Sequence, residues 1–196
     1  MIADIPGKLD EHVIVSAHYD SVWRGPGSID NASGVEGVRR VGEQFVGREL
    51  ERGVRLLSFA AEEIKLTGSR LYVDEAKIRG ELAPIAGMVN LDCIARGEKL
   101  NVLGSPPAML DRGVEAARAL GLLDRYELVT GPATGGVDSH WFAQEGVPAV
   151  TLLHFPYDEY HLPDESPALA DEQLIGDTVA LASALVDSLV EHPVAR

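Results

Sequence analysis

The chain alternates short, unbroken apolar runs with stretches in which apolar residues recur every three or four positions. The unbroken runs are bounded by polar or glycine-rich segments and predict buried β-strands. These strands cover 12–17, 54–61, 84–91, 100–103, 126–130 and 148–153. The periodic stretches predict helices over about 33–50, 68–78, 106–120 and 170–191, with a helical turn over 141–145.

Strands that alternate with helices predict an α/β fold. We expect a three-layer sandwich, in which a mostly parallel central sheet carries helices on both faces. The 196 residues, of which 45% are hydrophobic, can bury a sizeable core. No repeat, linker or low-complexity tract divides the sequence, so we expect one domain over 1–196.

Composition narrows the range of partners. Asp and Glu number 31 against 17 Lys and Arg, which makes the net charge −14, and such an acidic surface repels nucleic acid and anionic membranes. The single cysteine, Cys93, excludes an intrachain disulfide. No apolar run approaches eighteen residues and no leader precedes the first strand, so we expect no membrane segment. The compartment stays open: the cytoplasm, or secretion with a leader removed.

Acidic and imidazole side chains follow three predicted strands in succession. They are His18 and Asp20, then Glu62 and Glu63, then Asp92. The carboxyl ends of parallel strands meet at one edge of a sheet, so these groups should converge there, joined by Asp30 and His161. Several carboxylates gathered in one place repel one another unless cations neutralise them, and a divalent metal site is the simplest remedy.

The chemistry of this donor set narrows the choice of metal. Carboxylate and imidazole without thiolate suits Zn²⁺, Co²⁺ or Mn²⁺. Five such ligands exceed what one catalytic zinc takes from protein, whereas two metals bridged by a shared carboxylate would use them all. We therefore expect two divalent ions, of which Zn²⁺ is the leading choice.

Five short motifs resemble a known family, the co-catalytic zinc aminopeptidases that include bacterial leucyl aminopeptidase, aminopeptidase Y and the glutamate carboxypeptidases. The motifs are AHYDS (17–21), IDNASG (29–34), AAEEIKLTGS (60–69), NLD (90–92) and YH (160–161). Each is weak alone, but together they stand in the family's order and span most of the chain. The resemblance implies a zinc-exopeptidase-like fold and hydrolysis of peptides from the amino end.

The same resemblance implies a role for each matching residue. His18 and Asp92 would hold one metal, Glu63 and His161 the other, and Asp30 would bridge both. The remaining residues match assisting positions of the family: Asp20 as the carboxylate that orients the His18 ring, Glu62 as the general base, and Tyr160 as a donor to the developing oxyanion. The metals would polarise the scissile carbonyl and acidify a bridging water. A cis peptide is expected between Asp30 and Asn31.

Taken singly, these residues have simpler explanations. Glu62 and Glu63 suit the start of a helix, Asp92 suits a turn, and His161 suits a solvated loop. If these simpler explanations held, all of these residues would stand in the family's order only by coincidence. The metal site explains them together and is therefore favoured. His154, beside a buried strand, is expected to be a hydrogen-bonded structural residue, and the aromatic residues Trp23, Trp141, Phe155 and Tyr157 fit either a specificity pocket or the core.

Several functions share these ligands. We expect an aminopeptidase acting on peptides; the alternatives are a dipeptidase or carboxypeptidase of the same family, a glutaminyl cyclase, and a scaffold of the same fold without catalysis. The chain also begins close to its first motif, so it is short at the N-terminus compared with the family, and two explanations stay open: a trimmed N-terminus or a minimal member. There, 2–5 would be the remnant of a hairpin partner, and an exposed sheet edge would favour homo-oligomers.

Overall fold

A single seven-stranded sheet runs through the protein, and the computed structural model describes residues 1–195 of it. The strand order is β1-β3-β2-β4-β7-β5-β6. The strands are β1 (Ile2–Ile5), β2 (His12–His18), β3 (Gly53–Phe59), β4 (Ile85–Asp92), β5 (Lys99–Ser105), β6 (Glu127–Gly131) and β7 (Ala149–His154). The four central strands are parallel, while β1 runs antiparallel to β3, and β5 runs antiparallel to β7.

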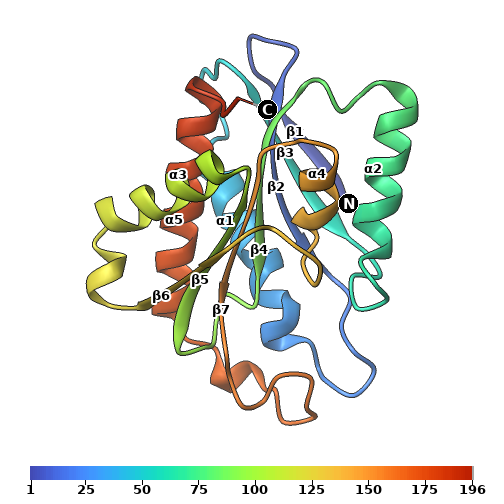
Figure 1. The fold of residues 1–196 in the computed structure, drawn as a ribbon. Helices are drawn as coiled ribbons and strands as arrows, with labels where there is room; N and C mark the ends of the chain where they lie inside the picture. Colours follow the sequence, from blue (N-terminus) through green and yellow to red (C-terminus); the bar gives the residue numbers. More distant parts are fainter. Residues whose placement is uncertain (196) are drawn as a thin grey trace.

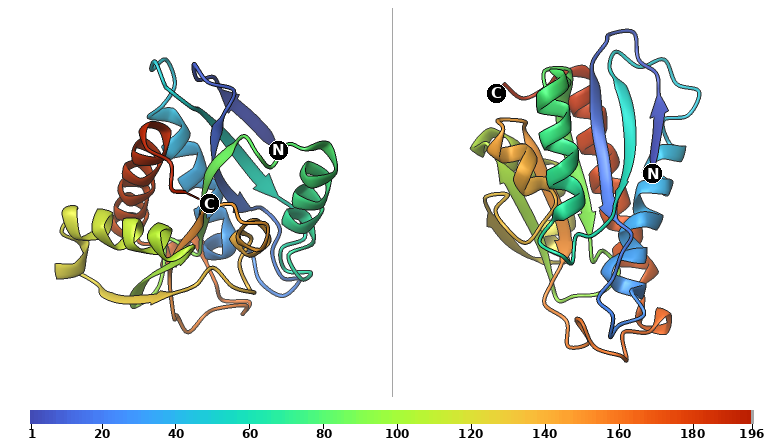
Figure 2. Two further views of the ribbon diagram at one scale, coloured as in Figure 1. Left: turned by 45° about the horizontal axis from the view of Figure 1, so that its top comes forward. Right: turned by 90° about the vertical axis from the view of Figure 1, so that its right-hand side faces the viewer.

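Helices cover both faces of this sheet (Figure 1). They are α1 (Gly34–Glu43), α2 (Thr67–Arg79), α3 (Pro107–Ala119), α4 (Ser139–Gln144) and α5 (Glu172–Glu191), with short helical turns η1 (Ser28–Ser33), η2 (Leu122–Asp124) and η3 (Pro167–Leu169). Helices α1, α3 and α5 lie on one side of the sheet and α2 and α4 on the other, as the left-hand view of Figure 2 also shows. The predicted α/β fold with a mostly parallel sheet is confirmed.

The core has one layer on each side of the sheet. In β2, Val13 and Val15 join the cluster under α1 and α5, whereas Ile14 between them joins the cluster under α2 and α4. All three side chains are fully buried. Burial on both faces explains why this strand is an unbroken apolar run rather than an alternating one.

The helix predicted over 33–50 is shorter in the structure, where α1 ends at Glu43. Beyond it, the amides of Gln44 and Phe45 bond three residues back, and Gly47 turns the chain at a φ of 77°. Phe45 is buried in the core, but Val46 is 69% exposed. Phe45 and Val46 continue the apolar spacing of the helix, so the prediction ran past its end. Gly47 is the one sequence feature that marks the tight turn there.

Helix α5 has the length and mean hydropathy, 1.4, of a membrane span by composition alone. The sequence shows no unbroken apolar run there, because polar residues interrupt the helix. Within the fold, 67% of that window is buried, and α5 contributes Leu181, Leu185 and Leu189 to the core. These contacts are those of a core helix.

Strand β1 does not form a hairpin with β2, which was the expectation for 2–5. It pairs antiparallel with β3 instead, Ile2 with Leu57 and Ile5 with Val54. The segment between β1 and β2 carries the chain past β3, so the next strand adds on its other side. Strands β1 and β6 are the two edges of the sheet, and homo-oligomer formation through an edge stays a prediction.

Candidate metal centre

The ends of two neighbouring parallel strands bring the first pair of predicted ligands together. His18 is the last residue of β2 and Asp92 the last residue of β4. The two strands pair in parallel, with Ser16 opposite Asn90, so two residues further on His18 and Asp92 come side by side. The His18 Nε2 lies 3.3 Å from Oδ1 of Asp92, and both residues are buried.

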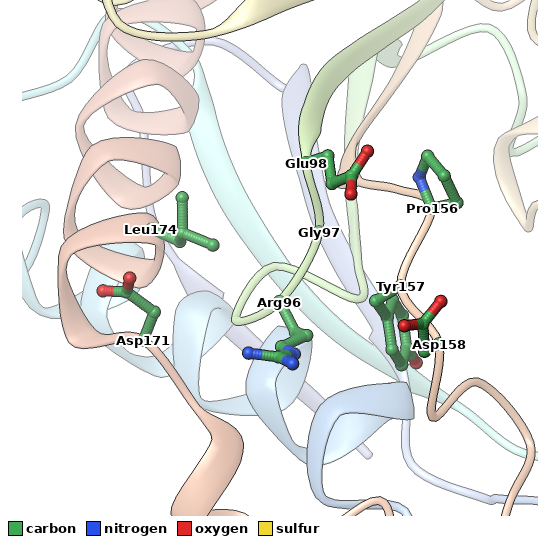
Figure 3. A pocket seen from close by; sticks show the side chains of 8 residues that line it. All are labelled: Arg96, Gly97, Glu98, Pro156, Tyr157, Asp158, Asp171 and Leu174. Atoms are coloured by element: carbon green, nitrogen blue, oxygen red, sulfur yellow. The ribbon is translucent and has the colours of Figure 1, made fainter.

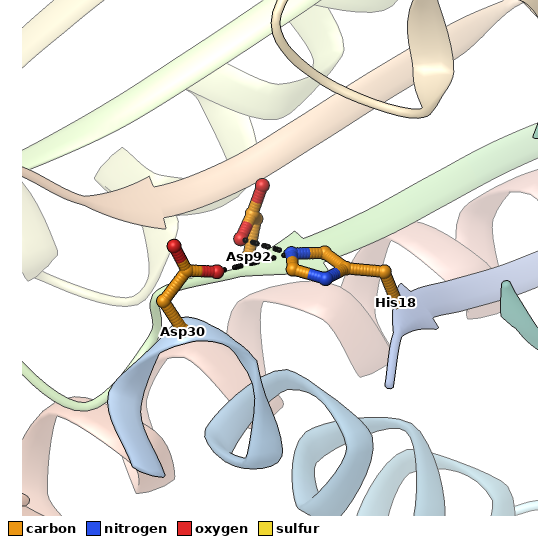
Figure 4. Close-up of side chains that lie close together, drawn as sticks. All are labelled: His18, Asp30 and Asp92. Carbon is orange, nitrogen blue, oxygen red and sulfur yellow. Dashed lines mark hydrogen bonds and ion pairs between the residues drawn. The ribbon is translucent and has the colours of Figure 1, made fainter. Parts of the chain in front are cut away.

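Asp30 reaches the same point from η1, the irregular turn between β2 and α1. Its Oδ1 lies 3.1 Å from Nε2 of His18, and its Oδ2 lies 3.0 Å from Nε2 of His161. Figure 4 shows the carboxyl group of Asp30 facing the His18 ring, with Asp92 on the neighbouring strand. One carboxylate therefore offers one oxygen to each of two imidazoles.

The second group forms around the other oxygen of Asp30. The Oε2 of Glu63, in the loop after β3, lies 3.2 Å from Nε2 of His161. The five predicted ligands thus make two groups of three, His18 with Asp30 and Asp92, and Asp30 with Glu63 and His161; within each group the donor atoms lie within 4.8 Å of one another. Asp30 is common to both.

The electrostatics of these groups call for added positive charge. Burial and the neighbouring Asp30 raise the pKa of Glu63, and its Oε1 is buried without a hydrogen-bond partner among the described residues. Burial opposes charge on His18, but hydrogen bonds to Asp30 and Asp92 outweigh it and raise the His18 pKa to about 12. An orphaned carboxylate oxygen within an oxygen and imidazole donor set fits a divalent cation.

Asp20 acts on the backbone of the neighbouring loop. Its Oδ1 accepts a hydrogen bond from the amide of Glu62 at 3.1 Å, and its Oδ2 accepts one from Glu63 at 3.3 Å. The His18 Nδ1 lies 3.0 Å from the main-chain carbonyl oxygen of Asp20 and 3.7 Å from its carboxylate. Asp20 therefore contacts the His18 ring chiefly through its backbone, while its side chain anchors both glutamates.

Glu62 and Tyr160 lie beside the ligands. The Oε2 of Glu62 is 4.0 Å from Nε2 of His18. Burial raises the pKa of Glu62 to about 8, opposed by His18 and reinforced by Asp92. The Tyr160 ring stacks on the His161 ring with 3.8 Å between their centroids and is 39% exposed. The structure brings all eight predicted site residues to one edge of the sheet.

Residues that were not predicted fix the loop that carries Asp30. The peptide bond between Asp30 and Asn31 is cis, as expected. The Asn31 side chain donates to the carbonyl oxygen of Leu91 at 2.9 Å and accepts from the amides of Gly34 and Cys93. These bonds tie η1 to both α1 and the end of β4. The polar motif around Asp30 indicated that this segment belongs to the site. It did not predict that the side-chain amide of Asn31 holds the loop in place.

Glu165 supports the same loop through its main-chain amides. It is 1% exposed, and its Oε1 accepts hydrogen bonds from the amides of Ile29 at 2.9 Å and Asp30 at 3.0 Å. Its Oε2 accepts from the hydroxyl of Tyr157 at 3.3 Å. Since His161 stands in the same segment, Glu165 couples the loops that carry Asp30 and His161.

Two cavities flank the site, and Tyr160 lines both. The glutamate cavity, about 410 Å³, is lined by Glu62 and Glu63 among others. The aspartate cavity, about 390 Å³, is lined by Asp92 and Cys93 among others. The five predicted ligands therefore have open space on either side of them.

Of the aromatic residues considered for a specificity pocket, Phe155 lines the aspartate cavity and Trp141 the glutamate cavity. Tyr157 is buried in the core, and Trp23 is 87% exposed. His154 is buried with its Nε2 3.2 Å from Oγ1 of Thr178, which confirms the expected structural hydrogen bond.

A third cavity, about 350 Å³, lies apart from the ligands, between the loop before β5 and the start of α5 (Figure 3). Its lining consists of Arg96, Gly97, Glu98, Pro156, Tyr157, Asp158, Asp171 and Leu174. Arg96 is paired with Glu159 at 2.9 Å, and Asp171 caps the amide of Gln173 at 2.8 Å. None of the predicted site residues lines this cavity.

The fold and the site define an α/β protein with a cluster of carboxylates and imidazoles, a candidate metal centre, at the carboxyl edge of its sheet. The model of Peptidase family M28 matches residues 1–186, and the chain belongs to this family. Aminopeptidase YwaD of Bacillus subtilis is 30% identical over 191 residues, which cover 89% of this chain and 41% of YwaD. The chain spans less than half the length of the curated relatives it matches.

Solved structures share the fold. BSAP, a zinc aminopeptidase from Bacillus subtilis, matches with a TM-score of 0.86 and 24% identity over 100% of this chain and 51% of that one. A glutaminyl cyclase from an Acidobacteriales bacterium matches with a TM-score of 0.82 and 18% identity over 97% of this chain and 73% of that one. Identity at this level establishes the α/β architecture, which both proteins have in common with this chain.

Proposed function

We propose that this chain carries the catalytic site of a metal-dependent aminopeptidase that removes N-terminal residues from peptides. Membership of Peptidase family M28 and the names of relatives such as YwaD support this function. The observation that carries it is the position of Asp30, whose two carboxylate oxygens face the imidazoles of His18 and His161. Such a shared carboxylate suits a pair of cations rather than one.

The donor set suits two Zn²⁺ ions. His18, Asp92 and one oxygen of Asp30 would hold the first, and Glu63, His161 and the other oxygen of Asp30 the second. BSAP, which shares the fold, is a zinc aminopeptidase, and this supports the choice of zinc. Bound cations at these positions would supply positive charge that polarises a peptide carbonyl and acidifies water.

Glu62 is the proposed general base. Its carboxyl group lies beside the proposed ligands, with Oε2 4.0 Å from Nε2 of His18, so it is placed to take a proton from water held there and to pass that proton to the leaving nitrogen. Asp20 holds the amides of Glu62 and Glu63, so it positions base and ligand together. Tyr160, between the two cavities, is the proposed hydrogen-bond donor to the oxygen that gains charge during hydrolysis.

The variant Glu62→Gln tests this assignment. It keeps the shape of the side chain but removes its capacity to carry a proton, so hydrolysis of leucine p-nitroanilide should fall by about 10²- to 10⁴-fold. The zinc content of the protein, measured by inductively coupled plasma mass spectrometry, should stay at the wild-type level. Glu81→Gln, at an exposed turn, is the matched control and should keep full activity. Unchanged turnover in Glu62→Gln would remove Glu62 as the base.

A substrate panel separates the proposed activity from its alternatives. An aminopeptidase releases the first residue of a tripeptide, and N-terminal blocking or a chelator abolishes the release. Release from the carboxyl end, or cleavage of dipeptides alone, would point to a carboxypeptidase or dipeptidase. Pyroglutamate formation without hydrolysis would point to a glutaminyl cyclase, and no reaction with zinc bound would point to a scaffold.

A further inference from the structure

The two cavities beside the metal centre take different parts of a substrate. This step rests on the proposed function, in which Glu62 passes a proton to the leaving nitrogen. The residue after the scissile bond therefore lies on the Glu62 side, in the glutamate cavity. The aspartate cavity, which Glu62 does not line, is left to receive the side chain of the N-terminal residue.

The floor of the aspartate cavity is formed by strands β5 and β7. Asn101 and Leu103 are two residues apart on β5 and so point to the same face of the sheet. Leu153 of β7 stands opposite Asn101 in the antiparallel register. All three line the cavity, so a polar side chain lies between two leucines on a largely apolar floor.

Hydrogen bonds fix the orientation of the Asn101 amide. Its Nδ2 donates to the carbonyl oxygen of Lys99 at 3.0 Å and to that of Phe155 at 3.1 Å, which uses both N–H groups. A flipped amide would place Oδ1 against those two carbonyl oxygens, which repel it. Within residues 1–195, no group donates to Oδ1 of Asn101, although Asn101 is only 9% exposed.

We propose that Asn101 is a specificity-determining residue whose Oδ1 accepts a hydrogen bond from the side chain of the substrate's N-terminal residue. The substrates this favours carry a neutral donor at the tip of a short side chain, namely an amide or a hydroxyl, as in asparagine and threonine. Leucine and valine match asparagine and threonine in shape. A cavity of this size with only apolar walls would accept leucine and valine and reject asparagine and threonine. A fixed acceptor offsets the cost of removing the donor from water.

The test compares kcat/KM for p-nitroanilides of asparagine and leucine, and of threonine and valine, on the zinc-loaded chain. In the wild type, the asparagine to leucine ratio should exceed about 0.1, because the acceptor compensates the buried amide. In Asn101→Leu, the asparagine to leucine and threonine to valine ratios should each fall by about tenfold. Thr134→Val removes another polar group from the same cavity and should leave both ratios at wild-type values.

A ratio of kcat/KM between two substrates of one variant separates substrate recognition by Asn101 from general damage to the structure. Loss of the bonds to Lys99 and Phe155 in Asn101→Leu lowers the rate for all four substrates alike and does not change a ratio. If Asn101→Leu does not fold, two measurements on the wild type test the inference instead. They are the asparagine to leucine ratio of kcat/KM, and the inhibition by free asparagine compared with that by free leucine. A wild-type ratio below 0.1, or ratios unchanged in Asn101→Leu, would overturn the inference while leucine is still released. No hydrolysis of any of the four substrates would overturn the proposed function and this inference with it.

Discussion

At the scale of single residues, the site depends on side chains that hold backbone as much as on those that face the centre. Asp30 presents its two oxygens to two imidazoles only while its main chain is held. Asn31 holds that main chain to the end of β4 and Glu165 holds it to the loop of His161. Ligand geometry depends on such supporting contacts, because a ligand that moves loses affinity for the metal.

Glu165 provides a direct test of this support. In Glu165→Leu, the buried amides of Ile29 and Asp30 lose their acceptor, so the free energy of unfolding should fall by roughly 2–5 kcal/mol. Zinc affinity, measured by competition with a chromogenic chelator, should fall as well. Glu165→Gln keeps an acceptor oxygen of the same reach and should retain most of both. Equal losses in the two variants would show that the charge matters and not the acceptor.

His154 makes stability depend on pH. Burial lowers its pKa to about 4 from the ordinary 6.5, so the folded protein keeps it neutral where the unfolded chain is protonated. Its contribution is therefore fully present above pH 6.5 and is lost as the pH falls towards 4, on the order of 3 kcal/mol in all. Urea unfolding in a chelator between pH 7.5 and 4.5 should show this fall.

The matched variants for this pH effect are two histidine substitutions. His154→Gln should be less stable at pH 7.5 but should lose less stability on acidification. His192→Gln, at an exposed position after α5, should keep the wild-type slope. Identical slopes for the wild type and His154→Gln would rule His154 out as the source.

The side chains that follow strands could be predicted, since a polar residue after a buried apolar run marks the carboxyl edge of a parallel sheet. His18, Asp92 and the Glu62–Glu63 pair were found in this way. Glu165 was not, because it lies in a charged, proline-containing segment without periodicity that resembles a solvated loop. Its burial results from contacts with η1, more than a hundred residues away in sequence.

At the scale of elements, the strand and helix boundaries followed from periodicity except where backbone conformation decides. The end of α1 and the irregular η1 turn depend on dihedral angles that apolar spacing does not reveal. The N-terminus of α1 packs against the end of β4 so closely that a Cβ atom on Gly34 would lie 2.5 Å from the carbonyl oxygen of Leu91. This close approach is what places η1 beside the ligands.

Two glycine to alanine substitutions in helices should therefore have opposite effects. Gly34→Ala should destabilise the protein by more than about 2 kcal/mol and weaken zinc binding, because the new methyl group meets Leu91 and the Asn31 side chain. Gly176→Ala, at an exposed position of α5 with open space around it, should stabilise by roughly 0.5–1 kcal/mol. Thermal and urea unfolding measure both. A stable Gly34→Ala variant would show that α1 can move away from β4.

At the scale of the whole molecule, sheet order was the part that periodicity could not supply. The antiparallel pairing of β5 with β7 places Asn101 opposite Leu153 and so builds the floor of the aspartate cavity. The apolar pattern of β5 is compatible with either direction, because a strand buried on both faces carries no mark of its partner. The direction of β5 follows from the short connection 93–98, which contains no helix and is too short for the crossover that a strand parallel to β4 would need.

We expect the stability of the whole molecule to depend on divalent cations, because the net charge is −14 and carboxylates gather at the proposed metal site. A cation that binds only the folded chain stabilises it by RT ln(1 + [L]/Kd), about 2.7 kcal/mol at a hundred times Kd. Thermal unfolding should therefore shift to higher temperature with zinc and return with a chelator. Glu62→Gln should keep this shift, and Asp30→Asn, which weakens the shared ligand of both groups, should lose most of it.

Magnesium at the same ionic strength separates binding from general screening of the acidic surface. An equal shift with magnesium, or a zinc shift that survives Asp30→Asn, would mean that the cations act elsewhere than at the two imidazoles.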